Sequence, residues 1–183
     1  MIYPIVAYGD PVLRKKTSCI EQGTEVKQFA EDMIATMNMA SGVGLAAPQV
    51  GKSISMFVAD FSYILAKDDP RKRVEVFINP VVEIAEGAVS SNHQEGCLSI
   101  PDILLDVPRK ESITIRYFDA DWRPHVKQWT GFPARIILHE YDHLEGKLHI
   151  DYVSPFRKQF IESRLNDISK GNIEIHYEMR FPG

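Results

Sequence analysis

The sequence has few cysteines, no long apolar run and no excess of positive charge. Two cysteines in 183 residues give no disulfide framework, and no stretch approaches the ~20 apolar residues that a membrane helix needs. Lys and Arg number 21 against 25 Asp and Glu, so the basic footprint of a nucleic-acid-binding protein is missing. No secretory signal is visible either. We therefore expect a cytoplasmic protein with no membrane partner and no direct nucleic-acid specificity.

The remaining composition is that of an ordinary globular protein. Apolar residues make up 44% of the chain and charged residues 25%, which excludes a disordered, collagenous or low-complexity chain. The length of 183 residues is sufficient for a hydrophobic core that needs no disulfides. No internal repeat or linker interrupts the sequence, so we expect one domain that spans residues 1–183.

Apolar spacing predicts three helices. Residues 24–40 carry one apolar stripe, with Thr24 as the N-cap and Gly42 just past the end. A second helix is expected over 132–146, where proline falls in the first turn. A third is expected over 154–171, with its apolar residues on one side.

Runs of alternating or β-branched residues predict strands that are separated from the helices along the chain. Residues 113–117 alternate apolar and polar side chains, and 126–130 are the expected hairpin partner. A strand over 74–78 is expected to end at Asn79-Pro80. Because helices and strands are segregated, we predict an α+β fold with a largely antiparallel sheet. Further strands are expected over 53–61 and 173–179, and loops or turns over 41–51 and 67–73.

The sharpest chemical signal is the segment His139-Glu140-Tyr141-Asp142-His143. On a helix, side chains at i and i+4 share a face, so both imidazoles can reach one metal ion. Glu140 can then address a water molecule held by that ion. The pattern is rare by chance in a chain with 6 histidines, so we expect His139 and His143 to bind a metal.

Two histidines are too few for a catalytic metal site, which usually has three protein ligands and a water. His149 is one candidate for the third ligand, because residues 139–149 match HExxHxxGxxH, the metzincin protease pattern. Cys97 is the other candidate, since its thiolate would complete a Cys/His/His site. The spacing within 139–149 does not decide between these two ligands.

Two glycine-containing segments supply further chemistry. Residues 42–49, Gly-Val-Gly-Leu-Ala-Ala-Pro-Gln, partly match a dinucleotide fingerprint, but they follow a helical pattern instead of a strand and contain a proline. We reject that interpretation and expect exposed backbone groups and one amide, Gln49. In residues 95–99, Glu-Gly-Cys-Leu-Ser, Cys97 sits among polar residues, whereas Cys19 has no such neighbours and is expected to be structural.

Together the segments GxGLAAxQ, EGCLS and HExxH resemble the motifs of peptide deformylases, the metal-dependent bacterial-type enzymes that remove the formyl group from nascent polypeptides. The three motifs are complete and in the family's order, and the resemblance extends from Tyr8 to Pro155. It implies an α+β fold in which largely antiparallel sheets pack around a central helix that carries HExxH, followed by a C-terminal helix and a final strand. Residues 1–183 would then form a single deformylase domain.

The resemblance assigns the third metal ligand to Cys97, beside His139 and His143. The implied reaction hydrolyses the N-terminal formylmethionine and releases formate, by a metal-bound hydroxide with Glu140 as general base and then general acid. One divalent ion is implied, with Fe(II) as the physiological ion. Zn, Ni and Co also suit a site with one thiolate.

The same resemblance implies two donors to the oxyanion of the transition state, the side-chain N–H of Gln49 and the backbone N–H of Leu98. Gly44 would give backbone hydrogen bonds to an extended peptide. A pocket for the methionine side chain needs apolar residues near the motifs, although core packing is the alternative for each of them. The candidates are Val43, Phe132 and Ile136.

Two residues depart from the family pattern. His149 stands where relatives usually have an aromatic residue, which makes the metzincin match a coincidence. Leu104 stands where many bacterial relatives have a basic residue near the peptide path, so a charge-based contact to the substrate is in doubt.

Two alternatives remain open. The main one is a metzincin-like zinc metalloprotease that uses His139, His143 and His149. The other is a binding module without activity, against which the intact Gln49, Cys97 and Glu140 argue. In the deformylase interpretation the partners are nascent N-formylmethionyl polypeptides, with a transient contact to the ribosome.

Overall fold

A computed structural model describes residues 1–183. Its α-helices are α1 (Lys27–Met39), α2 (Gly131–Leu144) and α3 (Pro155–Ser169), and its 3-10 helices are η1 (Pro11–Arg14), η2 (Ala47–Val50) and η3 (His149–Tyr152). Its strands are β1 (Ile5–Val6), β2 (Gly44–Ala46), β3 (Met56–Asp60), β4 (Val74–Glu83), β5 (Ser90–Cys97), β6 (Ile100–Lys110), β7 (Ser112–Phe118), β8 (Pro124–Thr130) and β9 (Met179–Arg180).

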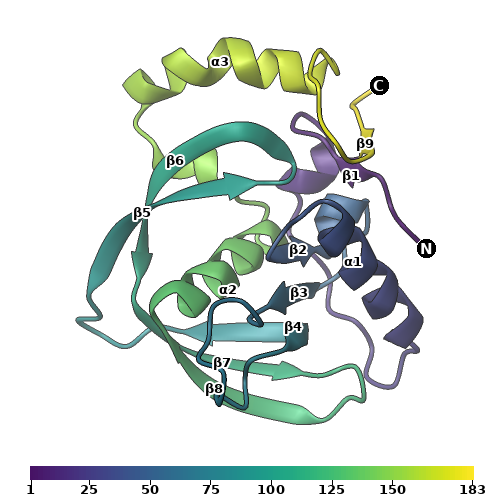
Figure 1. The fold of residues 1–183 in the computed structure, drawn as a ribbon, viewed down its shortest axis with the longest axis vertical. Helices are drawn as coiled ribbons and strands as arrows, with labels where there is room; N and C mark the ends of the chain where they lie inside the picture. The colour runs from purple at the N-terminus through teal and green to yellow at the C-terminus, as the bar shows by residue number, and fades with distance from the viewer.

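Helix α2 lies at the centre of the molecule, between a five-stranded sheet and the β5–β6 hairpin (Figure 1). It contacts β2, β3, β7 and β8 of the sheet and β6 of the hairpin. Its apolar face joins a core that includes Phe57, Phe77, Trp129 and Ile137. The α+β class and the three helices expected from the sequence are thus confirmed. None of the helices is long and apolar enough to cross a bilayer.

The five-stranded sheet has the order β2-β3-β4-β7-β8, and all its neighbouring strands are antiparallel. The predicted β7–β8 hairpin is confirmed, but the expectation that Asn79-Pro80 ends a strand was wrong. Strand β4 continues past the proline with a register shift between Ile78 and Val81. Asn79 adopts a φ of 49° there, and its amide pairs with both backbone groups of Ile20 at 2.9 and 2.8 Å. A bulge of this kind tolerates the missing N–H of proline.

The β5–β6 hairpin was missed in the sequence analysis. Strand β6 does alternate, with Ile103, Leu105 and Val107 buried, whereas β5 is mostly exposed and polar and gives no pattern. The register of the two strands shifts between Glu95 and Cys97. This irregularity, next to the turn at 98–99, changes the direction of the chain beside Cys97.

The region around α1 differs from expectation in two details. The helix starts at Lys27, and Thr24 does not cap it, because the Thr24 hydroxyl donates to the carbonyl of Glu21 at 2.7 Å. Residues 41–51 are not only a loop, since they contain β2 and η2. Strand β2 pairs with β3, with Leu45 opposite Val58, and a strand this short depends on its tertiary partner more than on its own residues.

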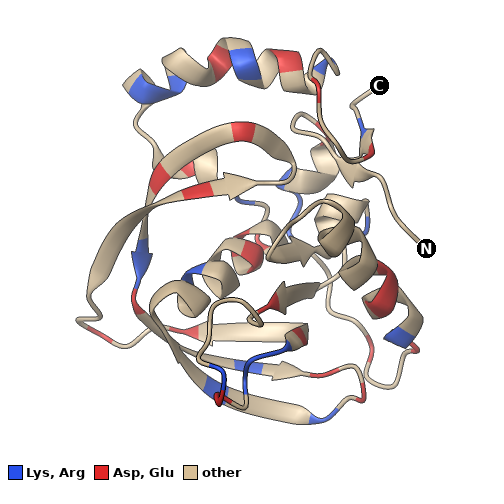
Figure 2. Ribbon diagram, viewed as in Figure 1, with Lys and Arg blue, Asp and Glu red and all other residues tan.

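Helix α3 begins as expected at Ser154, whose hydroxyl accepts the backbone N–H of Arg157 at 3.3 Å. Leu165 and Ile168 pack into the core that includes the buried residues of β6. Lys and Arg alternate with Asp and Glu along the outer surface of α3, and both signs occur over the rest of the ribbon (Figure 2).

The strand expected over 173–179 is present only at its end. Ile173, Ile175 and Tyr177 are partly buried and alternate with exposed neighbours, so the period-two pattern is real. The backbone finds a strand partner only at β9, which pairs in parallel with β1. The alternation arises because one side of the segment packs against the rest of the protein and the other side faces solvent.

Candidate active site

Three possible metal donors come together between α2 and the β5–β6 hairpin. One ligand atom each from Cys97, His139 and His143 lies within 4.8 Å of the other two. The Cys97 Sγ is 3.4 Å from the Nε2 of His143, and the two imidazole rings lie 5.1 Å apart, centroid to centroid. A soft thiolate with two imidazoles is a donor set that fits a divalent transition metal.

Glu95 fixes the orientation of His139. The Nδ1 of His139 is 2.9 Å from Glu95 Oε2, and because an ionised carboxylate only accepts, Nδ1 must donate. Burial alone would raise the pKa of Glu95, but the hydrogen bonds from His139 and Arg109 outweigh it and lower the pKa to about 2. Glu95 thus stays ionised, and Nε2 of His139 is the ring atom left free to bind a metal.

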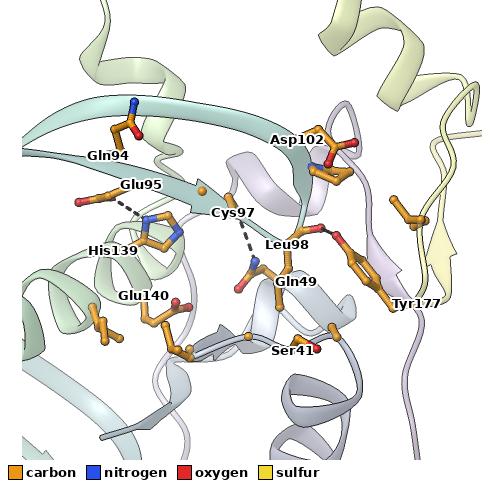
Figure 3. Close-up of a pocket in the computed structure, with 18 of the residues that line it drawn as sticks. Ser41, Gln49, Gln94, Glu95, Cys97, Leu98, Asp102, His139, Glu140 and Tyr177 are labelled. Carbon is orange, nitrogen blue, oxygen red and sulfur yellow. Dashed lines mark hydrogen bonds and ion pairs between the residues drawn. The ribbon is translucent and has the colours of Figure 1, made fainter. Parts of the chain in front are cut away.

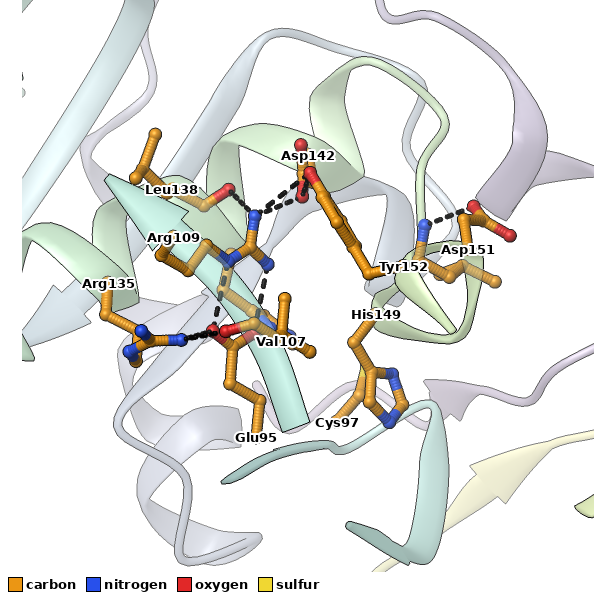
Figure 4. Close-up of polar contacts among 12 residues, drawn as sticks. Glu95, Cys97, Val107, Arg109, Arg135, Leu138, Asp142, His149, Asp151 and Tyr152 are labelled. Atoms are coloured by element: carbon orange, nitrogen blue, oxygen red, sulfur yellow. Dashed lines mark hydrogen bonds and ion pairs between the residues drawn. The ribbon is translucent and has the colours of Figure 1, made fainter. Parts of the chain in front are cut away.

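A buried cluster of charges holds Glu95 in turn (Figure 4). Arg109 donates to both Glu95 oxygens at 3.0 and 2.9 Å and also pairs with Asp142. Arg135 donates to Glu95 Oε1 at 2.7 Å and to the carbonyl of Val107 at 2.8 Å. The cluster joins β5, β6 and α2, so the helix cannot shift along the hairpin without breaking it.

Glu140 is buried, and its Oε2 has no hydrogen-bond partner in the protein. Burial raises the pKa of this carboxyl to about 7, so the side chain can hold a proton as well as release one. The backbone of Gly44 lies against it: a Cβ at Gly44 would be 2.7 Å from the carboxyl carbon of Glu140. Only glycine leaves room for the Glu140 side chain at this point of β2.

The amide of Gln49 has a defined orientation. Its Oε1 accepts the backbone N–H of Ala46 at 2.8 Å, so the NH₂ group must point the other way. The Nε2 atom lies 3.6 Å from the Cys97 Sγ and 3.3 Å from the Ser99 hydroxyl. The position therefore presents an N–H donor to the donor cluster, on the side of the thiolate (Figure 3).

One cavity of about 470 Å³ is lined by several of these groups: Gly44, Gln49, Glu95, Cys97, His139 and Glu140. His143 is buried and is not part of its lining. The three apolar candidates for a methionine pocket all line the cavity, with Val43 and Phe132 exposed and Ile136 buried. Leu104 is exposed on β6 and does not line the cavity. The sequence analysis missed several lining residues, above all Arg135 and the segment 174–177 that follows α3. Neither carries a local motif, although the period-two pattern of 173–179 marked a segment with one buried side.

His149 lies beside the donor cluster but is not part of it: its ring centroid is 6.1 Å from that of His139. It is buried in η3, and its Nε2 lies 3.2 Å from the carbonyl of Ile103. Burial lowers the pKa of His149 to about 4, so the ring is neutral at neutral pH. Only Cys97, His139 and His143 meet as a possible metal-binding group of His, Cys, Asp and Glu residues. Cys19, the other cysteine, is exposed.

Metal-dependent hydrolases with an HExxH helix are the class that this fold and donor set define. A family model described as polypeptide deformylase matches residues 2–159, and the chain belongs to this family. It is an enzyme that removes the formyl group from N-formylmethionine by metal-dependent hydrolysis.

The similarity to individual family members covers almost the whole chain. The peptide deformylase of Cytophaga hutchinsonii is 48% identical over 186 residues, which cover 100% of this chain and 98% of that protein. That of Christiangramia forsetii is 46% identical over 191 residues, with 100% and 97% covered. The crystal structure of the Thermus thermophilus enzyme has a TM-score of 0.81 and 43% identity, and the match covers 93% of this chain and 99% of that one.

Replacing Gly44 by alanine tests the close approach between β2 and Glu140. The added Cβ meets the end of a flexible side chain, so we expect Glu140 to move while the fold stays intact. Turnover should fall by about 10²–10⁴-fold, the usual contribution of a general acid–base group, with metal content and melting temperature unchanged. The Gly44→Ala kcat should approach that of Glu140→Ala; wild-type kcat in Gly44→Ala would contradict the proposed contact.

Proposed function

We propose that the chain deformylates nascent N-formylmethionyl polypeptides in the cavity between α2 and the β5–β6 hairpin, with one divalent ion held by Cys97, His139 and His143. The observation that carries this proposal is the convergence of those three donors at the edge of a cavity that Cys97, His139, Glu140 and Gln49 line. A divalent ion bound there would polarise the formyl oxygen and lower the pKa of a water molecule.

Glu140 is the proposed proton carrier. It takes a proton from the attacking water, whose oxygen bonds to the formyl carbon. It then delivers that proton to the amine nitrogen as the C–N bond breaks, so the products are formate and a free N-terminus. The burial of Glu140 and its unpartnered Oε2 support this role, because a base saturated by other hydrogen bonds could not accept the proton.

Gln49 and Leu98 are the proposed donors to the oxyanion that forms on the formyl oxygen. The fixed amide of Gln49 supports its part, because its oxygen is tied to Ala46 and only N–H groups are directed toward the thiolate. A donor that is already aimed costs no reorganisation during the reaction. The Leu98 N–H follows directly after Cys97 in the chain, so one turn would supply both a metal ligand and a donor.

Substrate selection rests on the rest of the cavity lining. We propose that Val43, Phe132 and Ile136 receive the methionine side chain, since all three line the cavity and are apolar. Gly44 would pair with an extended peptide backbone. Leu104 is uncharged and does not line the cavity, so we propose no cationic contact to the peptide at this position of β6.

Fe(II) is the proposed physiological ion, following the resemblance to the family. The donor set also accepts Zn, Ni and Co. We further propose that residues 1–183 form a single deformylase domain that works in the cytoplasm and meets the ribosome only transiently. The mixed charges of α3 support a weak contact, because they offer no uniform basic face for RNA.

The proposed function is tested with Ni(II)-loaded protein and two tripeptides, one with formyl-Met and one with acetyl-Met at its N-terminus. We expect rapid release of free amine from the formyl peptide alone. No release from fully metallated protein would contradict the proposed function.

Replacing Gln49 by glutamate keeps the shape of the side chain but removes the N–H donor. We expect kcat to fall by about 10²–10³-fold, as for the loss of an oxyanion donor, while metal content stays unchanged. Gln159→Glu, the same change on the exposed surface of α3, should behave as wild type. Near-normal turnover in Gln49→Glu would remove Gln49 from the proposed role.

The third metal ligand is tested by a pair of substitutions. Cys97→Ser should lose most of the bound metal and the activity, because serine is a poor ligand for a soft ion. His149→Phe should keep both, since His149 lies outside the donor cluster. The metal content of both variants is measured by atomic absorption. Retained metal in Cys97→Ser together with lost metal in His149→Phe would favour the metzincin-like protease.

A further inference from the structure

The segment that follows α3 returns to the catalytic cavity and forms one of its walls. Glu174, Ile175, His176 and Tyr177 line the cavity together with residues of the three motifs. The family model ends at residue 159, so this wall lies outside the part of the chain that the family model describes.

Tyr177 makes the one hydrogen bond that links this wall to the motif EGCLS. Its hydroxyl donates to the carbonyl oxygen of Leu98 at 2.8 Å, and Figure 3 shows the ring reaching toward Leu98. Leu98 and Tyr177 are both partly buried and pack against the same apolar cluster. The contact is therefore shielded from water on the ring side, where a hydrogen bond is stronger than in solvent.

The turn at 98–99 is held from two directions. The carbonyl of Ser99 accepts the backbone N–H of Tyr8 at 2.9 Å, and the carbonyl of Leu98 accepts the hydroxyl of Tyr177. Tyr8 follows β1 and Tyr177 precedes β9, and these two strands pair with each other. Two consecutive peptide carbonyls of the turn thus accept hydrogen bonds from residues that flank one small parallel sheet.

We infer that Tyr177 is a positioning residue for deformylation, because its hydroxyl fixes the peptide group after Leu98 and so keeps the Leu98 N–H directed at the oxyanion. This inference rests on the proposed function of Leu98. The N–H and the carbonyl of Leu98 belong to two peptide groups that meet at one α-carbon. The turn at 98–99 is closed at both ends by the pairing of Cys97 with Ile100, so the two peptide groups cannot rotate independently, and a hydrogen bond that holds the carbonyl also restrains the N–H. The hydrogen bond from Tyr177 therefore restrains the Leu98 N–H, which is the donor proposed to stabilise the transition state.

The test is Tyr177→Phe, which removes the hydroxyl and keeps the ring. We expect kcat to fall by about tenfold, less than for the loss of a donor, because the donor is misdirected and not removed. KM should stay within about twofold, because ground-state binding is not altered. Metal content and melting temperature should be unchanged, because the proposed metal ligands and the packing of the ring are retained. The exchange rate of the Leu98 amide hydrogen, followed by NMR, should rise, while that of β7 amides should not.

Tyr63→Phe is the matched control, because Tyr63 is 90% exposed and lies outside the cavity. An unchanged kcat in Tyr177→Phe, or a loss carried by KM or by metal content alone, would overturn the inference. The proposed function and the inferred role of Tyr177 are contradicted by different results. Absence of deformylation in the wild-type protein refutes the proposed function itself, whereas full deformylation by Tyr177→Phe refutes only the role of Tyr177.

Discussion

The buried carboxylate of Glu95 is the group on which the active site depends. It accepts hydrogen bonds from Arg109, Arg135 and His139, and Asp142 balances the second guanidinium charge. The two carboxylates and the two guanidinium groups balance one another in charge within this buried set. Removing one partner from such a buried set typically costs about 3–5 kcal/mol. The same contacts that orient a ligand therefore hold α2 against the hairpin.

Local patterns in the sequence were sufficient for the helices and for the β7–β8 hairpin, because a 3.6-residue stripe or a strict alternation is visible within one segment. They were insufficient where a tertiary partner decides the conformation. Strand β5 is polar on both faces and carries no pattern. The bulge at Asn79 depends on contacts with Ile20, far away in the chain, so a proline that normally ends a strand is accommodated within one.

The candidate site shows the same contrast between residues that a local pattern reveals and residues that only tertiary contacts reveal. His139, Glu140 and His143 could be identified from spacing, because metal chemistry demands those residue types on one helical face. The choice of Cys97 over His149 needed the additional motifs. The structure groups Cys97 with His139 and His143 as possible metal donors, whereas the Nε2 of His149 lies against the Ile103 carbonyl, with its ring 6.1 Å from that of His139. Arg135 and Tyr177 belong to no motif, and arginine and tyrosine occur in many surroundings. Only the folded chain brings Arg135 to Glu95 and Tyr177 to Leu98.

The parallel pairing of β1 with β9 makes one wall of the cavity depend on both ends of the chain. The pair joins Ile5–Val6 to Met179–Arg180, and the segment 174–177, which lines the cavity, lies just before β9. The candidate metal donors lie on β5 and α2, outside this pair. Fraying of the two short strands would therefore open one side of the cavity and leave those donors in place.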